Sequence, residues 1–262
     1  MLERPYDLIL TLGDDCACSW YLRAFGLQNA SYPFDWIGWA PIDRVVDLIV
    51  GDFEGFLDVS RFEPAVYPNP EATDEAHDFY KNTRTGLFFA HDFPAGVPPR
   101  ESLPEVEAKY GRRIRRFYEE TGRAKHVLFV WMSKTSCIDD GTLVRERARL
   151  AAKFPGIRID WLILENDSAM KPLEFRETEI SPNILRIVFD NVSYDTSDPS
   201  AEWRGNRRNI DAVFSRLHLK TPYGGRLKKA LYKPLKALCG LIPVRKYRRK
   251  IREALKHRLI GD

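Results

Sequence analysis

Cys16 and His91 are the two residues whose side chains could together carry out acyl-transfer chemistry. Cys16 follows an apolar run and two acids in the segment LTLGDDCACSW, so Asp14 or Asp15 can cap a helix that begins near the cysteine. Free backbone N–H groups at a helix start favour a thiolate, the reactive form of cysteine, and we expect them to lower the pKa of Cys16. The two carboxylates act in the opposite direction. Activation therefore requires an imidazole that takes the proton.

His91 is the best-placed imidazole, because it lies inside the apolar segment LFFAHDF rather than in a polar loop. We expect it to be the general base for Cys16, although a histidine in a strand can equally be a core residue bonded to the backbone. Asp92 points to the other face of an alternating strand and is a poor orienting group. Better candidates for orienting the imidazole follow later strands: Asn166, Asp190 and Asn191.

A second candidate site uses carboxylates in place of the thiol. Asp14 and Asp15 adjoin Cys16, and Asp35 lies within the aromatic segment SYPFDWIGWAP, residues 31–41. Trp36 and its aromatic neighbours could line a sugar or peptide groove, and Asp35 could contact the substrate with a pKa raised by burial. The alternative is a packed segment in which Asp35 caps a backbone group.

Apolar runs predict the strands, and helical periodicity predicts the helices between them. The strands are expected at residues 6–12, 86–93, 126–132, 157–164 and 183–189, and the helices at 16–25, 42–57, 103–122 and 139–154. Because the runs are continuous rather than alternating, both faces of the strands should be buried, as in a parallel sheet. We therefore predict an α/β fold with a mostly parallel sheet of about five or six strands and helices on both faces. The stretches 63–85 and 94–104 are predicted to be loops.

Each predicted strand runs into polar residues, which in an open α/β sheet would meet in one cleft at the carboxyl ends of the strands. Loops are polar wherever they contact water, so polar residues after the strands do not by themselves establish a shared cleft. Cys18, two positions after Cys16, points in another direction on the expected helix and should pack in the core.

The segments LGDDCACSWYLRAFGL, SYPFDWIG, FFAHDF and YGRRIRRF, the last followed by VLFVW, occur in this order along the chain. Their combination resembles a bacterial family of unknown function described as papain-like cysteine peptidases. The resemblance covers most of residues 6–217 and places the family's G-x-x-C cysteine at Cys16 and its histidine at His91. It implies a cysteine hydrolase or acyl transferase. No Asn or Asp stands in the strand immediately after His91, where papain-like order would place the third catalytic residue.

We therefore expect a cysteine-dependent hydrolase or acyl transferase that acts on a peptide or glycan. The alternative is a transferase or accessory protein of bacterial surface-polysaccharide assembly, with the carboxylates at its site and Cys16 in a structural role. A membrane-associated binding module without catalysis is the third possibility.

The composition favours a reducing compartment and implies no cofactor. Four cysteines in 262 residues are too few and too scattered for a disulfide framework, and none has zinc-ligand spacing. The N-terminus lacks the basic and apolar regions of a signal peptide, and no apolar run reaches the length of a membrane span. We expect a cytoplasmic protein.

The charge divides the chain into an α/β domain, residues 1–219, and a basic tail, residues 220–262. From Lys220 onward the net charge is +12, whereas the preceding residues carry −8. Leucines recur at helical spacing in the tail, which predicts basic amphipathic helices that bind an anionic membrane surface through residues 223–260. Nucleic acid is a less favoured partner because the apolar stripe is continuous, and packing of the tail on the acidic domain is the other alternative.

Overall fold

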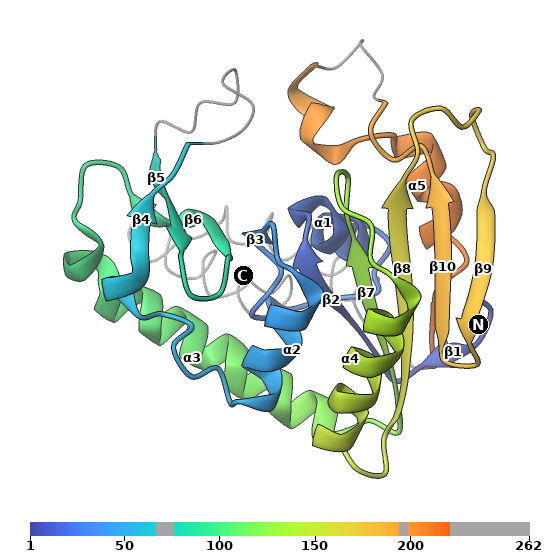
Figure 1. The fold of residues 1–262 in the computed structure, drawn as a ribbon, viewed down its shortest axis with the longest axis horizontal. Coiled ribbons are helices and arrows are strands. Elements are labelled where there is room, and N and C mark those ends of the chain that lie inside the picture. The colour runs from blue at the N-terminus through green and yellow to red at the C-terminus, as the bar shows by residue number, and fades with distance from the viewer. Residues whose placement is uncertain (67–75, 194–198, 221–262) are drawn as a thin grey trace, which may run out of the picture.

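A computed structural model describes residues 1–66, 76–193 and 199–220 of the protein (Figure 1). Apart from Lys220, the predicted basic tail lies outside the described residues, and so does the segment 223–260, for which the sequence predicts membrane binding. Within the described ranges, no helix is long and apolar enough to cross a membrane.

In the part of the chain that the structure describes, nine strands form one sheet and two short strands form a second. In spatial order the main sheet consists of β4 (Phe62–Pro64), β5 (His77–Asn82), β6 (Phe88–Pro94), β3 (Ile37–Gly38), β2 (Leu8–Asp14), β7 (His126–Met132), β8 (Arg158–Asn166), β10 (Ile184–Phe189) and β9 (Arg176–Ser181). The small sheet pairs β1 (Pro5–Tyr6) with β11 (His218–Leu219) in parallel.

The prediction of a mostly parallel sheet of about five or six strands is wrong, because the sheet is mixed and has nine strands among the described residues. Parallel pairing joins β3, β2, β7, β8 and β10 in the centre. Antiparallel pairing joins β4, β5, β6 and β3 on one side and adds β9 at the other edge. Two of the antiparallel strands, β4 and β5, lie within or just before the stretch 63–85, for which the sequence predicts a loop. The apolar run of β6 reflects burial against α3 and not parallel pairing.

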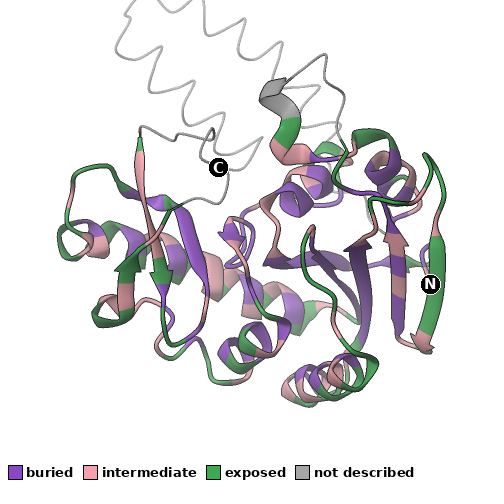
Figure 2. Cartoon of the chain, turned by 45° about the horizontal axis from the view of Figure 1, so that its top comes forward, coloured by how far each residue is buried: buried purple, intermediate pink, exposed green. Residues whose placement is uncertain are grey.

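Helices cover both faces of the sheet, as predicted. Their bounds are α1 (Cys16–Ala24), α2 (Ile42–Val50), α3 (Pro99–Arg123), α4 (Asp140–Lys153) and α5 (Arg207–Phe214), with 3₁₀ turns η1 (Val59–Arg61) and η2 (Pro199–Arg204). Along β2, Leu8, Leu10 and Leu12 pack with α2, α3 and α4, whereas Ile9 packs with α1 and α5 on the opposite face. This alternation follows from the two-residue period of a strand. Figure 2 shows the resulting buried centre and the exposed edge strand β9.

The turn from β2 into α1 lies at the point where the chain changes from one face of the sheet to the other. α1 follows β2 on one face, whereas α3 precedes β7 on the opposite face (Figure 1). Such a switch point leaves a crevice at the carboxyl ends of the central strands. Gly13 and Asp14 both have positive φ, 89° and 74°, and Asp15 caps α1 by accepting a hydrogen bond from the Ala17 N–H at 2.8 Å. The fold thus directs three consecutive polar side chains toward the crevice.

Candidate active site

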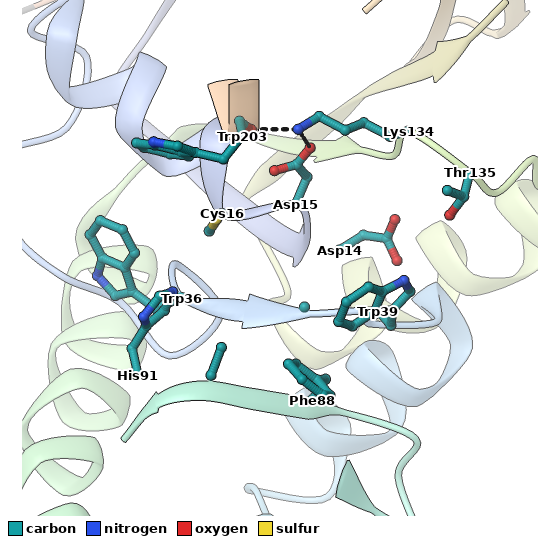
Figure 3. A pocket seen from close by; sticks show the side chains of 12 residues that line it. Asp14, Asp15, Cys16, Trp36, Trp39, Phe88, His91, Lys134, Thr135 and Trp203 are labelled. Atoms are coloured by element: carbon teal, nitrogen blue, oxygen red, sulfur yellow. Dashed lines mark hydrogen bonds and ion pairs between the residues drawn. The ribbon is translucent and has the colours of Figure 1, made fainter. Parts of the chain in front are cut away.

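A pocket of about 130 Å³ occupies the crevice at the carboxyl ends of β2, β3 and β7 (Figure 3). The turn after β2, the segment around β3, and β6 supply six of the residues that line it: Asp14, Asp15, Cys16, Trp36, Trp39 and His91. The loop after β7, the turn η2 and the wall formed by β6 supply four more large or polar side chains: Lys134, Thr135, Trp203 and Phe88. The pocket therefore combines a thiol, an imidazole, two carboxylates, an amine and four aromatic rings.

Cys16 is the first residue of α1, and its free thiol lines the pocket. Burial and the neighbouring Asp15 carboxylate raise the pKa of Cys16 to about 12, whereas Lys134 and the N–H groups of Cys16 and Ala17 lower it. Desolvation of the thiolate and the Asp15 charge therefore outweigh the lowering by the helix start, and the Asp15 effect has the direction expected for the neighbouring carboxylates. The thiol is protonated at neutral pH.

Cys18 is completely buried against the apolar face of α1, as the helical spacing predicts. Burial also raises the pKa of its thiol. Cys18 is thus a packing residue, and among the cysteines that the structure describes Cys16 is the one that lines the pocket.

His91 is exposed, although the residues on both sides of it in β6 are buried. The alternative of a core histidine therefore does not apply. Its ring lies 6.0 Å from the Trp36 ring, nearly perpendicular to it. Figure 3 shows Cys16, Trp36 and His91 toward one end of the pocket. Among the described contacts no hydrogen bond joins the Cys16 sulfur to the His91 ring, so the two groups share the pocket without being preassembled.

Lys134 connects the loop after β7 to the start of α1. Its ammonium group lies 3.1 Å from Asp15 Oδ2 and donates a hydrogen bond to the Trp203 carbonyl oxygen. The Asp15 side chain is only 9% exposed, so the ion pair is largely shielded from water. The position of Lys134 beside Cys16 thus offsets the negative charge of the N-cap.

Asp14 projects toward the other end of the pocket, near Trp39 and Thr135 (Figure 3). Burial raises the pKa of Asp14 to about 6 and the Asp15 charge adds to the effect, although hydrogen bonds from the Ser133 hydroxyl and the Ala40 N–H act against it. The strand β2 thus ends in a carboxyl group whose pKa is raised toward neutral pH, a property of general acids and bases.

A family model described as putative papain-like cysteine peptidase (DUF1796) matches residues 7–143. The chain belongs to this family. The matched segment contains both Cys16 and His91 and every pocket residue except Trp203. No curated protein and no solved structure matches the chain.

Asp35 does not line the pocket of this family member. Its fully buried carboxylate forms an ion pair with Arg23 at 2.7 Å and accepts hydrogen bonds from the Gln28 side chain and the Tyr32 N–H. These contacts join the aromatic segment to α1. Asp35 therefore has a packing role, which the sequence leaves open as the alternative to substrate contact. Trp36, the next residue, does line the pocket, and its ring lies 5.1 Å from the Arg23 guanidinium carbon.

Asn166 and Asp190 also lie outside the residues that line the pocket. Asp190 Oδ1 accepts hydrogen bonds from the N–H groups of Val192 and Ser193, and its Oδ2 accepts one from Asn206. The Asn166 amide oxygen accepts the Asn191 N–H. Asn191 in turn donates to the Ser133 carbonyl oxygen at 2.9 Å. These residues support the loop that carries Lys134.

The expectation of a cleft shared by all strand ends therefore holds for β2 and β7 but not for β8 and β10. Lys134 was identifiable as a polar residue after an apolar strand, and Trp39 belongs to the aromatic segment. Trp203 had no such signal, because it comes from a 3₁₀ turn about 190 residues later than Asp14 and reaches the pocket only through tertiary packing. Within the described ranges, no group of three or more His, Cys, Asp or Glu side chains is arranged to hold a metal ion.

Proposed function

We propose that the protein is a cysteine-dependent hydrolase or acyl transferase with Cys16 as nucleophile and His91 as general base. The observation that carries the proposal is that a thiol at the start of α1 and an exposed imidazole from β6 line one pocket. Both residues lie in the segment that matches the family model. A nucleophile and a base on separate elements of one cleft are the minimum that covalent catalysis requires.

The resting pocket keeps the thiol protonated, so the reaction begins when substrate occupies the pocket. His91 accepts the Cys16 proton, and the sulfur attacks the carbonyl carbon to form a tetrahedral oxyanion. The backbone N–H of Cys16, at the first position of the helix, is suited to stabilise that oxyanion. Collapse expels the leaving group, which takes the proton from His91. Water or an acceptor nucleophile then cleaves the thioester and regenerates the thiol.

The absence of a preformed bond between thiol and imidazole is compatible with this sequence of steps. Catalytic hydrogen bonds are often long in unliganded enzymes and shorten in the complex with substrate. His91 is exposed, so a substrate in the pocket can contact its ring. Formation of the imidazolium places a positive charge near Cys16, where Asp15 otherwise raises the thiol pKa.

A thioester-forming assay tests the proposal. p-Nitrophenyl acetate should release a burst of nitrophenol from the wild-type protein and acetylate Cys16, as shown by peptide mass spectrometry. Cys16→Ala should abolish the burst, and His91→Gln should slow it by roughly 10²-fold or more, because it removes the general base. Cys137→Ser, which alters an exposed cysteine outside the pocket, is the matched control. An unchanged burst in Cys16→Ala would refute the proposal.

Asp14 supports a second candidate function. A carboxyl group with its pKa raised to about 6, in a pocket with Trp36 and Trp39, is also suited to acid–base chemistry on a glycan. In this alternative the protein is a transferase or accessory factor of surface-polysaccharide assembly, and Cys16 is structural. Glycan turnover that survives Cys16→Ala and is lost in Asp14→Asn would favour it.

A further inference from the structure

The proposed cysteine chemistry leaves one end of the pocket without a role. This end is formed by Asp14, Trp39, Phe88 and Thr135 (Figure 3). We refer to it as the Asp14 subsite. It belongs to the same pocket as the nucleophile, and along the chain Asp14 and Cys16 are separated only by the N-cap residue Asp15.

The groups that favour the ionised form of Asp14 are neutral. They are the Ser133 hydroxyl and the Ala40 N–H, and no ion pair joins Asp14 to a lysine, arginine or histidine among the described residues. Asp15 differs, because Lys134 lies 3.1 Å away and offsets its charge. Among the described residues, the Asp15 carboxylate of the pocket is thus paired with a cation and the Asp14 carboxylate is not.

Aromatic rings border this carboxylate. The Trp39 and Phe88 rings meet edge to face, with centroids 4.6 Å apart. The backbone N–H of Trp39 donates a hydrogen bond to the Asp14 carbonyl oxygen at 3.2 Å, which keeps Trp39 beside Asp14. Both residues have positive φ, 41° for Trp39 and 74° for Asp14. Positive φ is unfavourable for residues other than glycine. The fold therefore keeps two strained backbone positions next to the pocket.

A carboxylate beside aromatic rings attracts a cation through two separate effects. The carboxylate supplies Coulomb attraction, and the faces of Trp and Phe rings attract an ammonium or guanidinium group through their quadrupoles. A neutral sugar would gain from the rings but would leave the negative charge uncompensated. An anionic substrate would be repelled.

We propose that the Asp14 subsite binds a positively charged side chain of the substrate, an ammonium or guanidinium group such as that of a lysine or arginine residue in a peptide. This inference rests on the proposed function, because it assumes that the acyl group of the same substrate reaches Cys16. It gives the enzyme a preference for peptides with a basic residue next to the cleaved or transferred bond.

Charged thiol reagents test the subsite through the reactivity of Cys16. The reagents are methanethiosulfonates. The Cys16 thiolate attacks their sulfenyl sulfur, a disulfide forms and methanesulfinate leaves. The 2-(trimethylammonium)ethyl reagent is cationic, and the 2-sulfonatoethyl reagent is an anion of similar size. For each protein, the ratio of the two rates at Cys16 is divided by the same ratio at the exposed Cys137, both measured by peptide mass spectrometry.

We expect the normalised ratio to favour the cation in the wild-type protein and to fall roughly tenfold in Asp14→Asn, because the attraction of a nearby carboxylate is lost. Asn tolerates positive φ and preserves the side-chain shape. Glu107→Gln, which removes an exposed negative charge on α3, should leave the ratio unchanged. A ratio that is equal in wild type and Asp14→Asn would overturn the inference.

Equilibrium binding provides a second measurement that does not require a reactive thiol. N-acetyl-lysine methylamide should bind at least roughly fivefold more tightly than its uncharged counterpart N-acetyl-norleucine methylamide, and Asp14→Asn should abolish the difference. Cys16→Ala eliminates the proposed reaction but should retain the difference in affinity between the two amides. Equal binding of the two amides contradicts the subsite, whereas a preference for lysine without any acylation of Cys16 contradicts only the proposed function.

Discussion

Lys134 Nζ lies 3.1 Å from Asp15 Oδ2, and this ion pair joins the loop after β7 to the N-cap of the helix that begins at Cys16. The two charges have opposite effects on the thiol, since Asp15 raises the pKa of Cys16 and Lys134 lowers it. Burial adds to the effect of Asp15 and is the larger cause. The balance of these effects favours the protonated thiol.

Asp15→Asn should make Cys16 more reactive. The substitution removes a negative charge that raises the thiol pKa, while asparagine caps a helix as well as aspartate does. We expect the pKa of Cys16 to fall by about one unit, which corresponds to a roughly tenfold faster alkylation at a pH below that pKa. The rate of Cys16 alkylation by iodoacetamide, followed between about pH 7 and pH 10, measures the change.

Lys134→Met is the reciprocal control for Asp15→Asn. It removes the positive charge and leaves Asp15 unpaired, so alkylation of Cys16 should become slower than in the wild-type protein. If both substitutions changed the rate in the same direction, the ion pair would act through the structure of the loop and not through charge.

Gly205→Ala should destabilise the part of the pocket formed by Trp203 and Lys134. Gly205 has a φ of +67°, and a Cβ atom there would overlap the backbone oxygen of Asn191, which cannot move as a side chain can. We expect the free energy of unfolding to fall by roughly 2 kcal/mol or more, measured by urea denaturation. Gly26→Ala is the matched control, because Gly26 has a φ of +70° and a Cβ added there would meet no atom within 4 Å. An equal loss in the two variants would show that only the backbone conformation matters.

The sequence predicted the parallel centre of the fold but not its antiparallel half. The segment 126–132 is expected as a strand and is β7, because seven consecutive positions are buried there on both faces. β9, with the sequence RETEIS, has no such signal, since an edge strand with exposed side chains resembles a loop in composition. β3 has only two residues, too few for any period.

The site was predictable where local chemistry determines it and not where tertiary packing does. The turn GDDC placed Cys16 at the helix start from capping preferences alone. The pKa of its thiol also depends on burial, which is the largest cause of the rise and which the local sequence does not show. Asp190 could not be assigned from its position after a strand, because its hydrogen bonds to Val192, Ser193 and Asn206 are set by the loop that follows it.

Asp35→Ala should be a stability variant rather than a variant of the pocket. It leaves the Arg23 guanidinium without its buried carboxylate and the Tyr32 N–H without its acceptor. Loss of one partner of a buried pair is expected to lower the free energy of unfolding by about 3 kcal/mol. Asp47→Ala, which breaks an exposed ion pair with Arg149, should cost less than about 1 kcal/mol. A stable Asp35→Ala protein that fails to bind substrate would instead assign Asp35 to substrate recognition.

Asp14→Asn should stabilise the protein at neutral pH, with a pH dependence that identifies the carboxylate. Burial raises the pKa of Asp14 from 3.8 to about 6, so the folded protein binds the proton more tightly than the unfolded chain does. Between these values the stability of the wild-type protein falls as the pH rises, because the unfolded chain ionises first and the folded state must then accommodate a buried charge. Asparagine resembles the protonated acid and carries no such cost.

The gain in Asp14→Asn should therefore be small near pH 4, grow as the pH passes through about 6, and level off above about pH 7. We expect it to reach roughly 1–2 kcal/mol, which is less than the full pKa shift implies because the side chain is partly exposed. Urea denaturation of both proteins across this range measures the gain, and Glu107→Gln should show no comparable trend. A gain that is independent of pH would mean that the amide stabilises the turn through its hydrogen bonds. The predicted trend would mean that the fold keeps a destabilising charge in the pocket, as expected for a group retained to bind a cation or to transfer a proton.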